Sequence, residues 1–226
     1  MSYAFTPVPL PTLPIKGSDQ LFPIHRIYCV GRNYAEHTKE MGGDTKDPPF
    51  FFQKNADNAV SDGTFPYPAM TQNVHFEIEL VVGLKSGGVN IAAADAMRHV
   101  FGYAVGIDMT RRDLQDVAKK LSRPWEVAKA FEASAPCTAM VPAREVESIA
   151  SGAIWLEVNG VRKQTGDLSQ MIWDVPNQIA FLSTLFELKA GDLIFTGTPA
   201  GVSAIKKGDK IRGHIDGVGD LHVTVV

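Results

Sequence analysis

The sequence of 226 residues has only two cysteines, little clustered basic charge and no long apolar run. Cys29 and Cys137 fit neither a disulfide framework nor a zinc motif, so we expect two reduced thiols in the core. The net charge is −3 and no basic patch is present, which argues against a nucleic-acid partner. No stretch reaches the ~20 apolar residues of a membrane helix, and the start does not resemble a signal peptide. We therefore expect a soluble, cytoplasmic protein with no membrane partner.

The composition is otherwise that of an ordinary globular protein, with 45% hydrophobic and 21% charged residues. A chain of this length can bury a core without disulfides or a structural metal, so any metal is expected to serve chemistry. Residues 1–22 carry Pro7, Pro9, Pro11 and Pro14 and are expected to form an extended arm without regular structure. Residues 23–226 are expected to form a single domain.

Short strands dominate the expected secondary structure. Hydrophobic patterning predicts strands over 26–30, 50–52, 74–82, 103–108, 154–158, 193–195 and 221–226. It predicts helices over 33–41, 111–121 and 175–188. Asn159-Gly160 predicts a tight hairpin. Because strands outnumber helices and do not alternate regularly with them, we expect a β-rich α+β domain and not a doubly wound parallel sheet.

Two glutamates alternate with apolar residues in the segment Phe76-Glu77-Ile78-Glu79-Leu80. In a strand, Glu77 and Glu79 share one face and the apolar residues take the other. A solvated outer face is the ordinary explanation for such a pair. The apolar residues that follow indicate a central strand instead, where buried carboxylates need a cation or protons. Oxygen ligands of this kind suit Mg²⁺, Mn²⁺ or Ca²⁺.

Further polar residues could extend this site. Asp108 ends an apolar strand and could complete a three-carboxylate face, or Asp108 or Thr110 could cap the following helix. His37 and Glu40, three residues apart on a predicted helix, would share a face. There Glu40 could orient His37 as a general base for water, although a surface pair is the simpler reading.

Three other features have open interpretations. Lys129 lies in an apolar stretch, either buried against an anion or with its ammonium at the surface. Arg112 and Gln115, on the helix after Asp108, could simply face solvent. The glycine-rich loop 196–201 follows a strand, and its backbone N–H groups could bind a carboxylate.

Taken together, these segments resemble the fumarylacetoacetate hydrolase family. The matching segments run in the family's order and cover about residues 24–226: 28–34, His37-x-x-Glu40, 76–80, 102–115, 125–131 and 192–201. The resemblance implies the family's mixed β-sandwich roll as the fold of a catalytic domain over 23–226. It also implies a homodimer.

The resemblance also implies roles for the candidate residues. Glu77, Glu79 and Asp108 match the acids that hold one divalent cation, expected here to be Mg²⁺ or Mn²⁺, with Ca²⁺ as a third choice. His37 and Glu40 match the family's catalytic pair that activates water. Lys129 and Gln115 match the catalytic groups that stabilise an oxyanion. The segment from His37 to Asp47 matches a lid. We expect Arg112, Gly197 and Thr198 to contact a small dioxo-acid substrate.

The short chain is similar to the acylpyruvase-like branch, and the segment 50–54 to fumarylpyruvate hydrolases of gentisate degradation. Asn55 departs from this pattern, since relatives often have proline there. The expected reaction is metal-dependent hydrolysis of a carbon–carbon bond in a 2,4-dioxo acid. Oxaloacetate decarboxylation or dioxo-acid isomerisation is the alternative on the same metal site. A non-catalytic binding protein on this scaffold is a further alternative.

Overall fold

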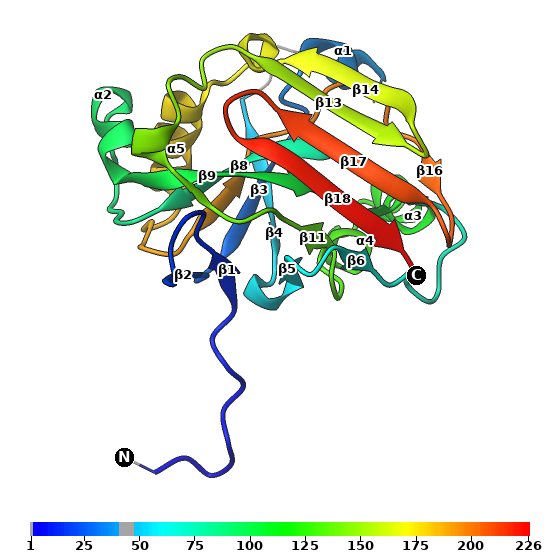
Figure 1. Cartoon of the computed structure of the whole chain (residues 1–226), viewed down its shortest axis with the longest axis horizontal. Helices are drawn as coiled ribbons and strands as arrows, with labels where there is room; N and C mark the ends of the chain where they lie inside the picture. Colours follow the sequence, from blue (N-terminus) through cyan, green and yellow to red (C-terminus); the bar gives the residue numbers. More distant parts are fainter. Residues whose placement is uncertain (1, 41–47) are drawn as a thin grey trace.

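The computed structural model describes residues 2–40 and 48–226, and of residues 38–40 it describes the helical backbone alone. Figure 1 shows a strand-rich body with helices at its periphery and an N-terminal segment that leads away from it. The β-rich α+β class predicted from the sequence is therefore confirmed. In the described part of the chain, no helix is long and apolar enough to cross a membrane.

A six-stranded mixed sheet forms the centre of the fold. In spatial order its strands are β12 (Val141–Pro142), β9 (Val100–Ile107), β8 (Ile78–Leu84), β15 (Leu193–Phe195), β3 (Ile27–Gly31) and β4 (Phe50–Lys54). Only β15 and β3 pair in parallel; the other neighbours are antiparallel. All seven residues of β8 are buried, as expected for a strand with neighbours on both sides.

A five-stranded sheet packs over one face of the central sheet, and Figure 1 shows its four longer strands side by side. Its order is β14 (Val161–Asp167), β13 (Ala153–Val158), β17 (Lys210–Ile215), β18 (Gly219–Val225) and β6 (Thr64–Phe65). The predicted hairpin joins β13 to β14, with φ of 52° at Asn159 and 78° at Gly160. Both values suit a type I′ turn.

Hydrophobic clusters cover both faces of the central sheet. Ile78, Leu80 and Val82 of β8 belong to the larger cluster, together with apolar residues of the five-stranded sheet. Val81 belongs to a second cluster on the other face, which also contains both free cysteines. Alternate residues of β8 therefore face opposite cores, and this alternation decides where Glu79 points.

Smaller elements surround the two sheets. They comprise the sheet β10 (Thr110–Arg111), β7 (Val74–His75) and β16 (Ala204–Ile205), the pair β11 (Ala135–Pro136) and β5 (Ala59–Val60), and the pair β1 (Thr12–Pro14) and β2 (Leu21–Pro23). The helices are α1 (Ala35–Glu40), α2 (Ala93–Ala96), α3 (Arg112–Lys120), α4 (Glu126–Lys129) and α5 (Val175–Leu185). Single 3₁₀ turns span Ala56–Asn58, Met97–His99, Ala143–Glu145 and Leu168–Gln170.

Two predicted elements need correction. The expectation that residues 1–22 lack regular structure is wrong, because β1 pairs with β2 and buries Leu13 and Phe22 in the second cluster. The strand predicted over 74–82 is two strands, β7 and β8, since Val74 and His75 pair with β10 and β16 instead of joining the central sheet. The break falls at Phe76 and Glu77, so Glu77 lies just outside β8.

Candidate active site

Three buried carboxylates meet at one end of the β8–β9 pair. Glu79 lies in β8, Glu77 immediately before it, and Asp108 immediately after β9. The Asp108 N–H donates to the Glu77 carbonyl at 2.8 Å, which places the two residues opposite each other across the strand pair. One oxygen from each of the three carboxylates lies within 4.8 Å of the others. The sequence-based expectation that the three acids converge is confirmed.

Buried cations surround two of these acids. Lys129, at the end of α4, donates from Nζ to Glu77 Oε2 at 2.9 Å, to Asp108 Oδ2 at 2.6 Å and to Thr110 Oγ1 at 2.6 Å. The Arg112 guanidinium donates to Glu77 Oε1. The interpretation of Lys129 as buried against an anion is therefore correct, because its side chain is 2% exposed and contacts two carboxylates.

Lys54 is a site residue that the sequence reasoning did not single out. Its Nζ lies 2.9 Å from Asp108 Oδ1 and donates to the backbone carbonyls of Met109 and Lys129. The side chain is fully buried. The Lys54 ammonium thus contacts both the Asp108 carboxylate and the backbone of Lys129. A signal was available, because Lys54 ends an aromatic-rich strand in which a charged residue needs a buried partner.

Glu79 has a different environment from the other two acids. Its Oε2 accepts a hydrogen bond from the Gly197 N–H at 2.7 Å. Burial raises the pKa of Glu79 well above its usual value, and the charges of Asp108 and Glu77 raise it further. Burial also acts to raise the pKa of Glu77, but Lys129 and Arg112 outweigh it and lower this pKa below its usual value. Without a cation, Glu79 therefore favours its neutral form, whereas Glu77 favours its ionised form.

The donor set fits a hard divalent cation. All three candidate ligands are carboxylates, which suit Mg²⁺, Mn²⁺ and Ca²⁺ better than softer metals. Burial, followed by the charges of Asp108 and Glu77, raises the pKa of Glu79, so its ionised form needs a further positive partner. A cation among Glu77, Glu79 and Asp108 would stabilise the ionised form of Glu79, so these residues could hold it.

The remaining site candidates lie around a small cavity beside the acids. Its volume is about 30 Å³, which is room for an ion or a water molecule. It is lined by His37, Gln115, Arg112, Lys129 and Thr198, together with the two glutamates. The side chain of Glu40 and residues 41–47 of the expected lid lie outside the described part of the chain.

Three residues expected to contact substrate have protein partners. Arg112 donates to Gln115 Oε1 as well as to Glu77, so neither Arg112 nor Gln115 simply faces solvent. Thr198 Oγ1 accepts from Gln164 Nε2 at 2.8 Å. The glycine-rich loop does bind a carboxylate, as its geometry allowed, but the carboxylate is that of Glu79.

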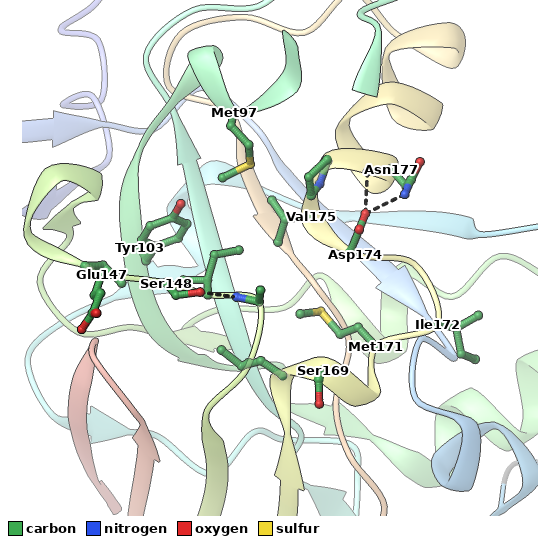
Figure 2. A pocket seen from close by; sticks show the side chains of 15 residues that line it. Met97, Tyr103, Glu147, Ser148, Ser169, Met171, Ile172, Asp174, Val175 and Asn177 are labelled. Carbon is green, nitrogen blue, oxygen red and sulfur yellow. Dashed lines mark hydrogen bonds between the residues drawn. The ribbon is translucent and has the colours of Figure 1, made fainter. Parts of the chain in front are cut away.

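A second, larger cavity is separate in its lining from the acids. Figure 2 shows this recess, which has a volume of about 560 Å³ and lies beside the start of α5. Its wall includes Tyr103, Met171 and Val175. The polar group of Asp174 accepts from the Asn177 N–H at 3.0 Å and so caps α5. The lining of the recess lacks the convergent buried carboxylates and cations of the smaller cavity.

The chain belongs to the fumarylacetoacetate hydrolase family. Residues 26–226 match the family described as "Fumarylacetoacetate (FAA) hydrolase C-terminal". The crystal structure of fumarylpyruvate hydrolase from Pseudomonas aeruginosa in complex with Mn²⁺ and pyruvate has a TM-score of 0.97 and 48% identity, covering 100% of this chain and 99% of that chain. The resemblance read from the sequence motifs is thus confirmed, and with it the family's fold.

Two curated relatives differ in their named activities. The fumarylpyruvate hydrolase of Ralstonia sp is 44% identical over 177 residues, covering 78% of this chain and 92% of the relative. The mitochondrial oxaloacetate tautomerase FAHD1 of Rattus norvegicus is 42% identical over 200 residues, covering 88% of this chain and 90% of the relative. Both comparisons place this chain among enzymes of one family, so its particular reaction has to be argued from its site.

Proposed function

We propose that this protein hydrolyses the bond between C3 and C4 of fumarylpyruvate and releases fumarate and pyruvate. The observation that carries the proposal is the buried group of Glu77, Glu79 and Asp108, with oxygens within 4.8 Å, beside a cavity that His37 lines. Glu77, Glu79 and Asp108 would hold a divalent cation, which would supply positive charge that binds the pyruvoyl end and makes the pyruvate enolate an acceptable leaving group.

The protein's own side chains carry the remaining steps. His37, oriented by Glu40, removes a proton from water, and the resulting hydroxide adds to the C4 carbonyl. Gln115 donates to the oxyanion that forms at C4, a contribution of about 3 kcal/mol per donor in other enzymes. The N–H groups of Lys129 are directed at Glu77, Asp108 and Thr110, so Lys129 stabilises the oxyanion through its positive charge. The C3–C4 bond then breaks, its electron pair passes to the pyruvate end, and the proton held by His37 returns to C3.

Two more residues lie where they could select the substrate. Arg112 and Thr198 line the same cavity as the glutamates, and we assign them to the carboxylate groups of the dioxo acid. Gly197 contributes differently from the initial expectation, because its N–H holds Glu79 in place. The glycine has φ of 98°, and a Cβ there would meet Asn33 Cβ at 2.6 Å. Only glycine fits this position without displacing its neighbour.

Oxaloacetate tautomerisation is the second candidate, favoured by the 42% identity to the Rattus norvegicus enzyme. Tautomerisation and decarboxylation use the same stabilised enolate but need no activated water. The buried His37 at the cavity favours hydrolysis over decarboxylation, which needs no general base, whereas tautomerisation also needs a base to move its proton. The Pseudomonas aeruginosa complex with Mn²⁺ and pyruvate supports the same choice.

The test is a parallel assay of fumarylpyruvate, acetylpyruvate and oxaloacetate with the Mg²⁺- and Mn²⁺-loaded protein. We expect the highest kcat/KM for fumarylpyruvate, with fumarate and pyruvate formed in equal amounts. The metal-stripped protein should be inactive until either cation is restored. Faster turnover of oxaloacetate than of both acylpyruvates would replace the proposal with the tautomerase or decarboxylase alternative.

The proposal extends to setting and assembly. We assign the protein to gentisate-type aromatic catabolism in the cytoplasm, with Mg²⁺ or Mn²⁺ as its cation and a homodimer as its assembly. Residues 23–226 form the catalytic domain in this proposal, and residues 1–22 form an arm whose base is the β1–β2 pair. No residue of the arm has a role in the proposed reaction.

A further inference from the structure

The first residues of the chain expose apolar side chains to an unusual degree. Residues 2–10 are all exposed, and the exposed fractions are 77% for Tyr3, 81% for Phe5, 85% for Val8 and 64% for Leu10. Figure 1 shows the segment extended and leading away from the body. Four large apolar side chains in so short a segment indicate a surface that is buried against another molecule.

Over residues 7–10, the prolines leave hydrogen-bond donors on one edge only. The Pro11 carbonyl accepts from the Ile24 N–H at 2.8 Å, so the edge with odd-numbered residues faces β2. Pro7 and Pro9 lie on that edge and have no N–H. In an extended backbone, Val8 and Leu10 direct their N–H groups to the opposite edge.

The edge that carries the N–H groups of Val8 and Leu10 is continued by Pro14 and Lys16, which already form backbone hydrogen bonds with Met140. Pro14 O accepts from the Met140 N–H at 2.7 Å, and Lys16 N donates to Met140 O at 2.9 Å. Upstream of this contact, the edge continues past Thr12 to Leu10 and Val8. The arm is therefore arranged to add as a strand to a further sheet edge, with its other edge closed by proline.

We infer that residues 2–10 form an exchange arm that pairs with a strand edge of a second copy of this chain. The inference starts from the homodimer proposed above and does not depend on the substrate. Each copy carries both the arm and open sheet edges, at β14 and at β4, so two copies can bind each other reciprocally with twofold symmetry.

Two observations favour a second copy over another kind of partner. Residues 2–10 contain no charged side chain, which does not suit a nucleic acid or a charged lipid surface. The match to the Pseudomonas aeruginosa enzyme covers 100% of this chain, arm included, so that chain has a counterpart of the arm. Because the arm is present in both proteins, we expect it to serve an interface between identical chains.

The experiment measures the dimer dissociation constant by sedimentation equilibrium. The variants are the full chain, a deletion of residues 2–10, and Y3S/F5S/V8S/L10S. The matched control is Met70→Ser, because Met70 is 86% exposed and lies outside the arm. We expect both arm variants to raise the dissociation constant at least about tenfold, because the buried apolar area is lost, and the control to leave it unchanged. Thermal unfolding monitors that each variant is folded.

A second pair of variants tests the pairing edge. Leu10→Pro removes an N–H from the open edge and should weaken the dimer, whereas Pro9→Ala adds one to the closed edge and should not. A dimer of equal affinity with and without the arm would overturn the inference while the proposed homodimer stands. A monomeric full chain would overturn both, and the fumarylpyruvate assay would still decide the catalytic proposal. An unchanged dimer in Leu10→Pro would overturn strand pairing.

Discussion

The recess beside α5 and the cavity at the acids differ in size by more than tenfold, and we assign the chemistry to the smaller one. The recess beside α5 encloses about 560 Å³, and Asp174 in its wall is occupied in capping that helix. The cavity at the acids encloses about 30 Å³ but brings buried carboxylates together with buried Lys129 and Arg112. Buried charges cost free energy unless they are matched, so their concentration marks a functional site better than volume does.

The two cavities are also connected through the backbone. The Ile172 N–H donates to the Asn33 carbonyl at 2.8 Å, and Ile172 lies in the wall of the recess. The side chain of Asn33 in turn donates to the Thr196 carbonyl at 2.7 Å, next to the glycine that holds Glu79. Substitutions on the two sides can therefore show whether the recess only supports the site or takes part in it.

The largest contrast is expected for Glu79→Gln. The amide oxygen can still accept from Gly197, but the loss of charge should weaken Mn²⁺ binding and reduce kcat/KM roughly a thousandfold or more. Because the raised pKa of Glu79 marks its charge as unfavourable without metal, the metal-free variant should unfold at the same or a higher temperature. Ala150→Ser, at an exposed position of the recess wall, is the control and should leave both quantities unchanged. Normal turnover of the Gln variant in chelator-treated buffer would refute the metal assignment.

His37→Ala is expected to separate metal binding from hydrolysis. Because His37 is not among the three carboxylate ligands, the variant should bind Mn²⁺ normally, as titration calorimetry can measure. Loss of the general base should lower kcat by roughly 10²–10⁴-fold. Retained kcat would remove His37 from the base role and would move the proposal toward enolate chemistry without activated water.

Lys54→Met should affect stability more than any single substitution in the recess. Its removal leaves Asp108 with one lysine fewer and leaves two buried carbonyls without their donor. Breaking a buried ion pair from one side costs about 3–5 kcal/mol, measurable as a lower urea midpoint. Ile149→Ala, at the recess, should cost less than half as much. Equal midpoints for the two variants would mean that Lys54 does not organise the acids.

The smallest effect is expected at His75, on the rim of the charged site. Burial and the neighbouring Arg112 lower the pKa of His75 to about 4, from an ordinary value of 6.5. As the pH falls from 6.5 to about 4, the unfolded chain binds a proton that the folded chain does not, so stability decreases. His75→Gln should reduce the stability loss between pH 7 and pH 5, and the exposed His222→Gln should not. Identical pH profiles for all three proteins would contradict the shift.

Segments whose structure depends on local interactions could be predicted from the sequence. The Asn159-Gly160 turn follows from the φ values those residues tolerate, and the shared face of Glu77 and Glu79 follows from strand alternation. The split at Phe76 could not be predicted, because β7 leaves the central sheet to pair with β10 and β16, both distant in sequence. The β1–β2 pair could not be predicted either. Its prolines do not favour a strand, and its register depends on the packing of Leu13 and Phe22 in the second cluster.

The sequence by itself determined which residues could form a metal site and on which face of a strand two of them lie, because side-chain chemistry and strand periodicity are local properties. Only the tertiary structure decided that Asp108 lies opposite Glu77 and that Lys54 pairs with the Asp108 carboxylate. It also decided that the Gly197 N–H donates to Glu79. These contacts join segments far apart in the chain. They depend on strand order and burial, which no local pattern specifies.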